Sequence, residues 1–131
     1  MHIKIIKHEN IIFDEDVSEV YSKGLEGEFG ILNGHEPIMS ALDIGVTKVV
    51  QKDETKLFTT MGGLLQFKDD EAIILTDAGE YGGDIDVARA KEAKARAEAR
   101  LNEVDASIDA KRAEAALARA MVRLKAALKN T

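Results

Sequence analysis

Glycine and proline are confined to the first two thirds of this 131-residue chain. All ten glycines and the single proline, Pro37, lie within residues 1–84, whereas residues 85–131 contain neither and hold fifteen alanines. Glycine and proline mark turns, and alanine is the strongest helix former. The chain must therefore combine a turn-rich module with a continuous helical module, and the boundary lies at residue 84.

The net charge changes sign at the same boundary. Residues 1–84 carry seven lysines, no arginine and seventeen acidic residues, whereas residues 85–131 carry five lysines, six arginines and seven acidic residues. The overall charge of −6 argues against a general nucleic-acid binder. The lack of cysteine excludes disulfides and thiolate zinc sites, and the three histidines are too scattered to indicate a metal site. We expect no membrane span, because no apolar run approaches about 18 residues, and no signal peptide ahead of the first strand.

Short segments rich in β-branched residues fill the acidic module, and acidic turn signals separate them. These segments are His2–His8, Val17–Lys23, Ile44–Gln51, Lys56–Thr60, Leu64–Lys68 and Ala72–Thr76. Their close spacing, without helical patterns between them, predicts an antiparallel sandwich or barrel. The glycine-rich segment Gly27–Pro37 is either a tight loop or an interaction loop.

The basic module predicts a helical hairpin. Helices are expected over Ile85–Asn102 and Ile108–Lys129, joined by a turn at Glu103–Ser107, with Asp84 or Asp86 as the first cap. Four apolar residues recur at helical spacing in the second helix: Leu117, Met121, Leu124 and Leu128. Alanine buries little area, so the seam between the helices should be thin and the hairpin marginally stable alone.

All six arginines lie in the hairpin, and their spacing in both helices is seven and then four. Most charged helix faces are solvated and carry local ion pairs. Local ion pairs cannot account for Arg119 and Arg123, because these two have no acidic residue three or four positions away. In a closed hairpin Arg89 lies level with these two, and such a cluster suits a phosphate or an acidic protein surface. No P-loop and no catalytic constellation is present, so we expect no enzymatic activity.

The segment GEFGILNGHEP, residues 27–37, resembles the GE(L/F)GILPGHEP signature of the ε subunit of bacterial F-type ATP synthases, and the resemblance continues through IGVTKVV, MGGLLQF and the basic hairpin. It implies an N-terminal antiparallel β-sandwich of about ten strands over residues 1–84, followed by an antiparallel two-helix hairpin over residues 85–131. By the same resemblance, the sandwich binds the γ subunit and the c ring of a proton- or sodium-driven synthase, peripheral at the cytoplasmic face of the bacterial membrane. Glu28 and His35 belong to that interface, although His35 could equally order its own loop. The hairpin would switch between a compact form and an extended form that meets the α and β subunits and restrains ATP hydrolysis.

A narrower resemblance joins IDVARA, residues 85–90, to the I/LDxxRA motif of ε subunits that bind ATP as a regulatory ligand. It implies a site made of eight residues: Glu80, Ile85, Asp86, Arg89, Ala90, Arg96, Arg119 and Arg123. Asp86, Arg89 and Ala90 would share one helix face. Alternatively, Asp86 is only the helix cap and Arg89 its ion-pair partner.

Three other functions stay open at this point. A stalk subunit could lack a functional ATP site, with the DxxRA motif serving only the helix. A regulatory nucleotide sensor could act outside a synthase, and a pull-down would separate the two. A nucleic-acid-binding hairpin would use the same arginines without needing Asp86, but the acidic first module makes nucleic acid an unexpected partner.

Overall fold

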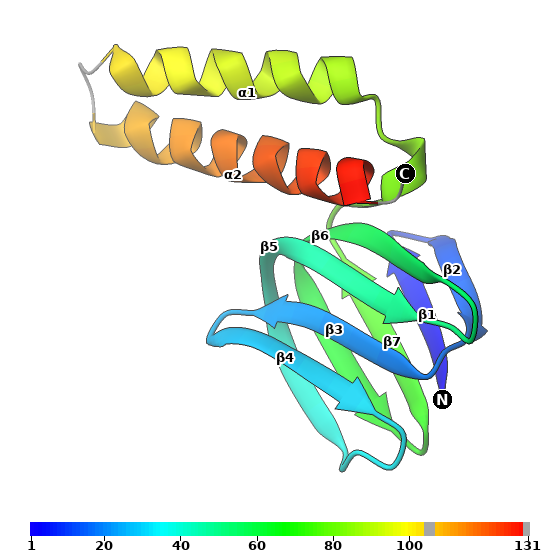
Figure 1. Ribbon diagram of the computed structural model, residues 1–131. Coiled ribbons are helices and arrows are strands. Elements are labelled where there is room, and N and C mark those ends of the chain that lie inside the picture. The colour runs from blue at the N-terminus through cyan, green and yellow to red at the C-terminus, as the bar shows by residue number, and fades with distance from the viewer. Residues whose placement is uncertain (104–106, 130–131) are drawn as a thin grey trace.

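The computed structural model describes residues 1–103 and 107–129, in which a folded β-sheet carries a helical hairpin across one end (Figure 1). The strands are β1 His2–Lys7, β2 Asn10–Asp16, β3 Glu19–Gly24, β4 Gly27–Leu32, β5 Ile38–Val50, β6 Thr55–Lys68, β7 Glu71–Thr76 and β8 Gly79–Tyr81. The helices are the short 3-10 helix η1 Gly82–Asp84, then α1 Val87–Asn102 and α2 Ser107–Lys129. Most of the expected turn at residues 103–107 lies outside the described residues.

The strands form one hydrogen-bonded sheet in the order β2-β1-β7-β6-β5-β3-β4, and β8 pairs with β6 away from this path. All pairs are antiparallel except β1 and β7, which run parallel, so the expectation of a purely antiparallel sheet is wrong for this pair. Three strands were not predicted: β2, the short β8, and β4 at the start of the glycine-rich segment taken as a loop.

The sheet becomes a sandwich because its two longest strands bend together. β5 has 13 residues and β6 has 14, and the two strands pair with each other. Gly62 and Gly63, in the middle of β6, have φ angles of 79° and 117°. A Cβ at Gly63 would lie 2.0 Å from the carbonyl oxygen of Leu75, so no other residue fits there. Beyond this bend β6 pairs with β7, and before it with β8. Within the described residues there are eight strands rather than about ten, because β5 and β6 each cross both layers without interruption.

The interior of the sandwich is apolar apart from a chain of hydroxyl groups. Alternate residues point inward in strands such as β1, where Ile3 and Ile5 are fully buried. Among them the buried hydroxyl of Thr47 lies 2.8 Å from that of Ser22 and 3.1 Å from that of Thr60. This hydroxyl chain (Ser22, Thr47 and Thr60) connects β3, β5 and β6 through the core.

The helices of the hairpin meet along alanines. Ala90 and Ala97 of α1 are buried, as are Ala113, Ala120, Ala126 and Ala127 of α2. Met121 and Leu128, from the apolar stripe that was expected to mark a helix face, are more than half exposed. The small alanines let the two helices approach closely and leave these larger side chains at the flank.

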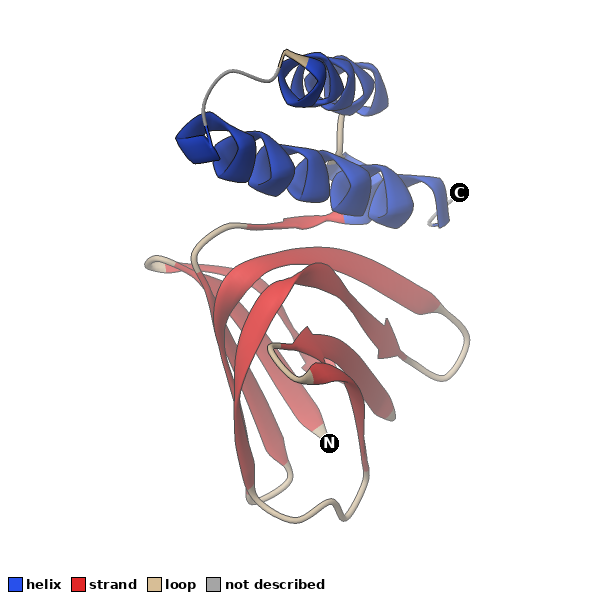
Figure 2. Ribbon diagram, turned by 90° about the vertical axis from the view of Figure 1, so that its left-hand side faces the viewer, coloured by secondary structure: helices blue, strands red, loops and turns tan. Residues whose placement is uncertain are grey.

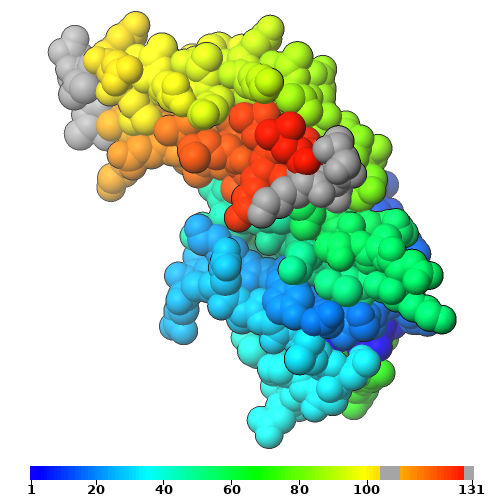
Figure 3. Space-filling view, in the orientation of Figure 1, coloured from blue at the N-terminus to red at the C-terminus, as the bar shows by residue number. Residues whose placement is uncertain are grey.

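The longer helix lies against the sandwich and the shorter one covers its outer side. α2 packs on β5, β6 and η1, while α1 packs on α2 (Figure 2). The space-filling view shows α2 seated on the sandwich surface, with α1 above it (Figure 3). The hairpin therefore has its compact arrangement in this structure.

We predict that a fragment of residues 1–84 folds alone. Every residue of the buried core cluster lies between Ile3 and Ile74, and Tyr81 packs against it, so the hairpin contributes nothing to that core. Circular dichroism should show β structure and cooperative thermal unfolding for this fragment. A fragment that stays unfolded would show that the sandwich needs α2.

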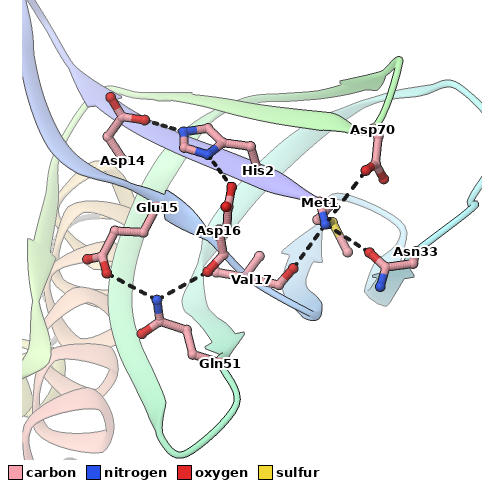
Figure 4. Close-up of polar contacts among 9 residues, drawn as sticks. All are labelled: Met1, His2, Asp14, Glu15, Asp16, Val17, Asn33, Gln51 and Asp70. Carbon is pink, nitrogen blue, oxygen red and sulfur yellow. Dashed lines mark hydrogen bonds and ion pairs between the residues drawn. The ribbon is translucent and has the colours of Figure 1, made fainter.

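A second prediction concerns His2 on β1, beside the edge strand β2. Its Nδ1 lies 2.7 Å from Asp16 and its Nε2 contacts Asp14, both on the neighbouring strand β2 (Figure 4). These hydrogen bonds, first to Asp14 and then to Asp16, raise the pKa of His2 above 6.5. Because the folded-state pKa is the higher one, the protonated ring stabilises the fold below pH 6.5, and this contribution is lost as the pH rises through the raised pKa.

Urea denaturation at pH steps from below 6.5 upward would measure this loss. The difference in free energy of unfolding between the wild type and His2→Gln should shrink as the pH rises. A double variant, Asp14→Asn with Asp16→Asn, keeps the ring and should lose the same pH dependence. A difference that stays constant over the whole range would contradict the prediction.

Candidate functional site

A cavity of about 570 Å3 lies between the β8 edge of the sandwich and the helical hairpin. Seven of the eight residues implied by the ATP-site resemblance line it: Glu80, Ile85, Asp86, Arg89, Ala90, Arg96 and Arg123. Arg119, the eighth, lies one turn before Arg123 on α2 and does not line the cavity. Residues that are far apart in the sequence thus form one site only in the compact arrangement.

Strand β8 and helix α2 meet at this cavity through an ion pair. Arg123 donates from Nε to Oε1 of Glu80 at 2.8 Å, across 43 positions of sequence. The backbone N–H of Glu80 in turn donates to the buried hydroxyl of Thr59 on β6 at 3.0 Å. Arg123 therefore has an acidic partner after all, although no local one.

Asp86 begins α1 at the wall of the cavity. Its Oδ1 accepts a hydrogen bond from the backbone N–H of Arg89 at 3.1 Å, which is the geometry of an N-cap. The cap is therefore confirmed, but no ion pair joins these two side chains in the described residues. One carboxylate oxygen of Asp86 and the guanidinium of Arg89 stay available to a ligand.

Among the described side chains, Arg89, Arg96 and Arg100 do not form the local ion pairs expected of a solvated helix face either. The one local salt bridge among the described side chains of the two helices lies within α1 and joins Lys94 to Glu98, at 3.7 Å. Arg89 and Arg96 share the cavity face of α1 but form no salt bridge with any described residue. Two guanidinium groups thus face the cavity uncompensated, which suits an anionic ligand.

The volume of the cavity and the small side chains of its α1 wall fit a small organic anion. Its volume is within the usual range of ligand sites, about 300–1,000 Å3. Ala90 is 4% exposed and Ala93 lies beside it, so the α1 wall has no bulky side chain at this level. The positive end of the α1 dipole adds to the attraction for negative charge.

Sequence reasoning missed two charged residues of this cavity, Lys7 and Asp84, and three small ones, Ala78, Gly79 and Ala93. Asp84 had been considered only as a helix cap. For Lys7 a signal existed, because it continues the inward-facing alternation of Ile3 and Ile5, but the sequence could not show what lies at the end of β1.

The interface residues implied by the resemblance lie elsewhere. Glu28 is exposed on β4 and lines a second cavity, of about 440 Å3, together with Tyr21 and Lys125. The candidate site is the larger cavity, because seven of the eight residues implied by the ATP-site resemblance line it. His35 contacts the carbonyl oxygen of its neighbour Glu36 through Nδ1, at 2.6 Å, and its ring meets that of Phe67 edge-on. The loop-ordering role considered for His35 is thus present.

Two family descriptions match the chain almost end to end. The family described as ATP synthase, Delta/Epsilon chain, beta-sandwich domain matches residues 1–82, and the one described as ATP synthase, Delta/Epsilon chain, long alpha-helix domain matches residues 84–127. Among solved structures, a chain of the Euglena gracilis mitochondrial ATP synthase superposes with a TM-score of 0.81 over 96% of this chain and 79% of that chain, at 24% identity. This likeness shows a shared fold.

Individual relatives agree with these matches. The ATP synthase epsilon chain of Pelotomaculum thermopropionicum is 44% identical over 95% of this chain and 93% of its own length. That of Desulforamulus reducens is 40% identical over 95% of both chains. A sodium ion specific epsilon chain, from Acetobacterium woodii, is 40% identical over 77% of both chains. These relatives confirm the predicted resemblance and the expectation of a non-catalytic subunit, and the chain therefore belongs to the ATP synthase epsilon-chain family.

Proposed function

We propose that this chain is the ε subunit in the central stalk of a proton- or sodium-driven F-type ATP synthase, and that ATP regulates it by binding the compact hairpin. The observation that carries the ATP part is the gathering of seven motif residues, from β8, α1 and α2, around one cavity. Chance alignment of a short motif would not bring Glu80 and Arg123 to the same place as Asp86 and Arg89.

Each group in the cavity has a role toward ATP. Arg89, Arg96 and Arg123 are the phosphate-binding groups, because guanidinium forms charge-assisted, often bidentate hydrogen bonds with phosphate oxygens. The second carboxylate oxygen of Asp86 accepts from a donor on the nucleotide, while the first caps α1. Ile85 and Ala90 supply an apolar wall without filling the space.

ATP binding would favour the compact form because the cavity is made by both modules. Moving the hairpin away from the sandwich separates Glu80, on β8, from Arg123, on α2, and opens the cavity. A ligand shifts two states only by its difference in affinity between them, and the extended form lacks half the site. The stabilisation is RT ln(1 + [L]/Kd), about 2.7 kcal/mol at a hundredfold excess of ATP over Kd. Falling ATP would then release the hairpin to meet the α and β subunits and restrain hydrolysis.

The sandwich is the part that we assign to the rotor. The loop that carries His35, together with Glu28 on β4, faces the γ subunit and the c ring in this proposal, as the signature segment implies. Neither α1 nor α2 has, over its described residues, the length and apolar character needed to cross a bilayer. Attachment at the cytoplasmic face of the membrane would come through the γ subunit and the c ring.

A second candidate function keeps the stalk role and assigns no ligand to the cavity. It is favoured by one observation, that Asp86 has a role within the fold itself as the N-cap of α1. The two candidates differ in what substitutions at Asp86 and Arg89 do to ATP binding.

We predict that Arg89→Ala weakens ATP binding by roughly ten- to hundredfold, since a hydrogen bond to a charged group contributes about 1.5–3 kcal/mol. Arg100→Ala is the matched control, because Arg100 is exposed on the same helix and does not line the cavity. Asp86→Ser keeps a capping oxygen but removes the charge, and should also weaken binding while helix content stays constant. Calorimetric titration with ATP and circular dichroism give the two readouts.

Unchanged ATP affinity in both Arg89→Ala and Asp86→Ser would leave the motif a helix cap and select the second candidate. Weakening by Arg100→Ala to the same degree would show that only the overall charge of the hairpin matters.

We also predict that ATP raises the melting temperature of the intact chain but not of the fragment 1–84. The intact chain has the whole cavity, whereas the fragment retains only the sandwich wall, with Lys7 and Glu80. A distance probe between the sandwich and Ala127 should report closure as ATP is added. Equal thermal shifts in both proteins would place the ligand on the sandwich and remove the basis for the switch.

A further inference from the structure

Strand β1 ends with a lysine on the face that points into the sandwich. Ile3 and Ile5 are fully buried, and Lys7 is the next residue on the same face, because side chains alternate along a strand. The ammonium group of a lysine on the inward face of a strand must contact water or a polar partner outside the apolar core, because burying an unpaired charge is costly. Lys7 is half-buried and reaches the cavity below the hairpin.

The parallel pairing of β1 with β7 determines which residues surround Lys7. Lys7 is opposite Thr76, the last residue of β7, so the end of β1 lies beside the short link that leads to β8. Lys7 therefore faces the same cavity as Arg89, Arg96 and Arg123, but from the sandwich. In the part of the chain that the structure describes, its ammonium group forms no salt bridge.

The charges around the cavity leave Lys7 without a dedicated counterion. Four cationic side chains line it against three carboxylates, those of Glu80, Asp84 and Asp86. Glu80 is already paired with Arg123, and Asp86 gives one oxygen to the cap of α1. A negatively charged ligand would supply the missing partner, and a lysine ammonium is a compact point charge suited to phosphate.

We propose that Lys7 is a specificity-determining contact that binds the phosphate chain from the sandwich side while the arginines bind it from the hairpin. This inference rests on the proposed function, since it concerns the ligand of the same cavity. The phosphate chain then bridges the two modules directly. Because Coulomb attraction grows with the charge of the ligand, Lys7 favours a nucleoside triphosphate over a diphosphate.

The test compares Lys7→Gln with Lys4→Gln in the full chain. Lys4 is on the same strand but on its opposite face, and it does not line the cavity. Calorimetric titrations with ATP and with ADP at one fixed salt concentration give four affinities, and thermal unfolding without ligand checks that both variants fold. Lys7→Arg keeps the charge, and Lys7→Met keeps an unbranched apolar stem if Gln disturbs the strand end.

We expect Lys7→Gln to bind ATP about tenfold more weakly, to lose less affinity for ADP, and so to have a smaller preference for ATP. Lys4→Gln and Lys7→Arg should stay within about twofold of the wild type. Equal affinities in wild type and Lys7→Gln would overturn this inference and leave the proposed ATP site standing. An equal loss in Lys4→Gln would also overturn it, because the effect would then be one of overall charge. A wild-type chain that binds neither nucleotide would overturn both proposals.

Discussion

The ion pair between Arg123 and Glu80 joins the helical hairpin to the β8 edge of the sandwich, beside the packing of α2 on β5, β6 and η1. Both side chains are about one-third exposed, so the pair contributes on the order of 1 kcal/mol or less. Its two residues also line the cavity, so the pair joins the β8 wall of the cavity to the α2 wall. Under the proposed function, a contact this weak would let the hairpin leave the sandwich, so that a ligand in the cavity decides the balance between the compact and extended forms.

Local sequence patterns predicted the two modules that this ion pair joins, but they could not identify the partner of Arg123. The glycine boundary and the alanine-rich tail predicted a β module followed by a helical hairpin, because turn residues and helix formers act locally. The missing local acids at Arg123 pointed to a partner outside its helix. Its identity needed the fold, because the position of Glu80 depends on how β8 pairs with β6. Lys7 was missed for the same reason.

Other differences between the sequence-based predictions and the structure arise from contacts between distant segments, which no local sequence pattern records. The parallel contact of β1 with β7 follows from the order of strands in the sheet, and alternation of residues is the same in parallel and antiparallel pairs. In α2 the leucine and methionine spacing correctly indicated a helix, but two residues of this stripe, Met121 and Leu128, are more than half exposed. Close approach of two helices is decided by the smallest side chains, which here are Ala113, Ala120 and Ala127.

The buried hydroxyl chain of Ser22, Thr47 and Thr60 has a consequence for how the chain folds. A slip of β5 by one residue would turn Thr47 out of the core and bring the exposed ammonium group of Lys48 in. It would also strip the hydroxyls on β3 and β6 of their shared partner inside an apolar interior, where an unpaired polar group is costly. A misaligned pairing of β5 and β6 therefore costs free energy in two ways: it buries the charge of Lys48, and it removes the hydroxyl of Thr47 from Ser22 and Thr60. Three small hydroxyl groups thus favour the native register of β5 over a register slipped by one residue.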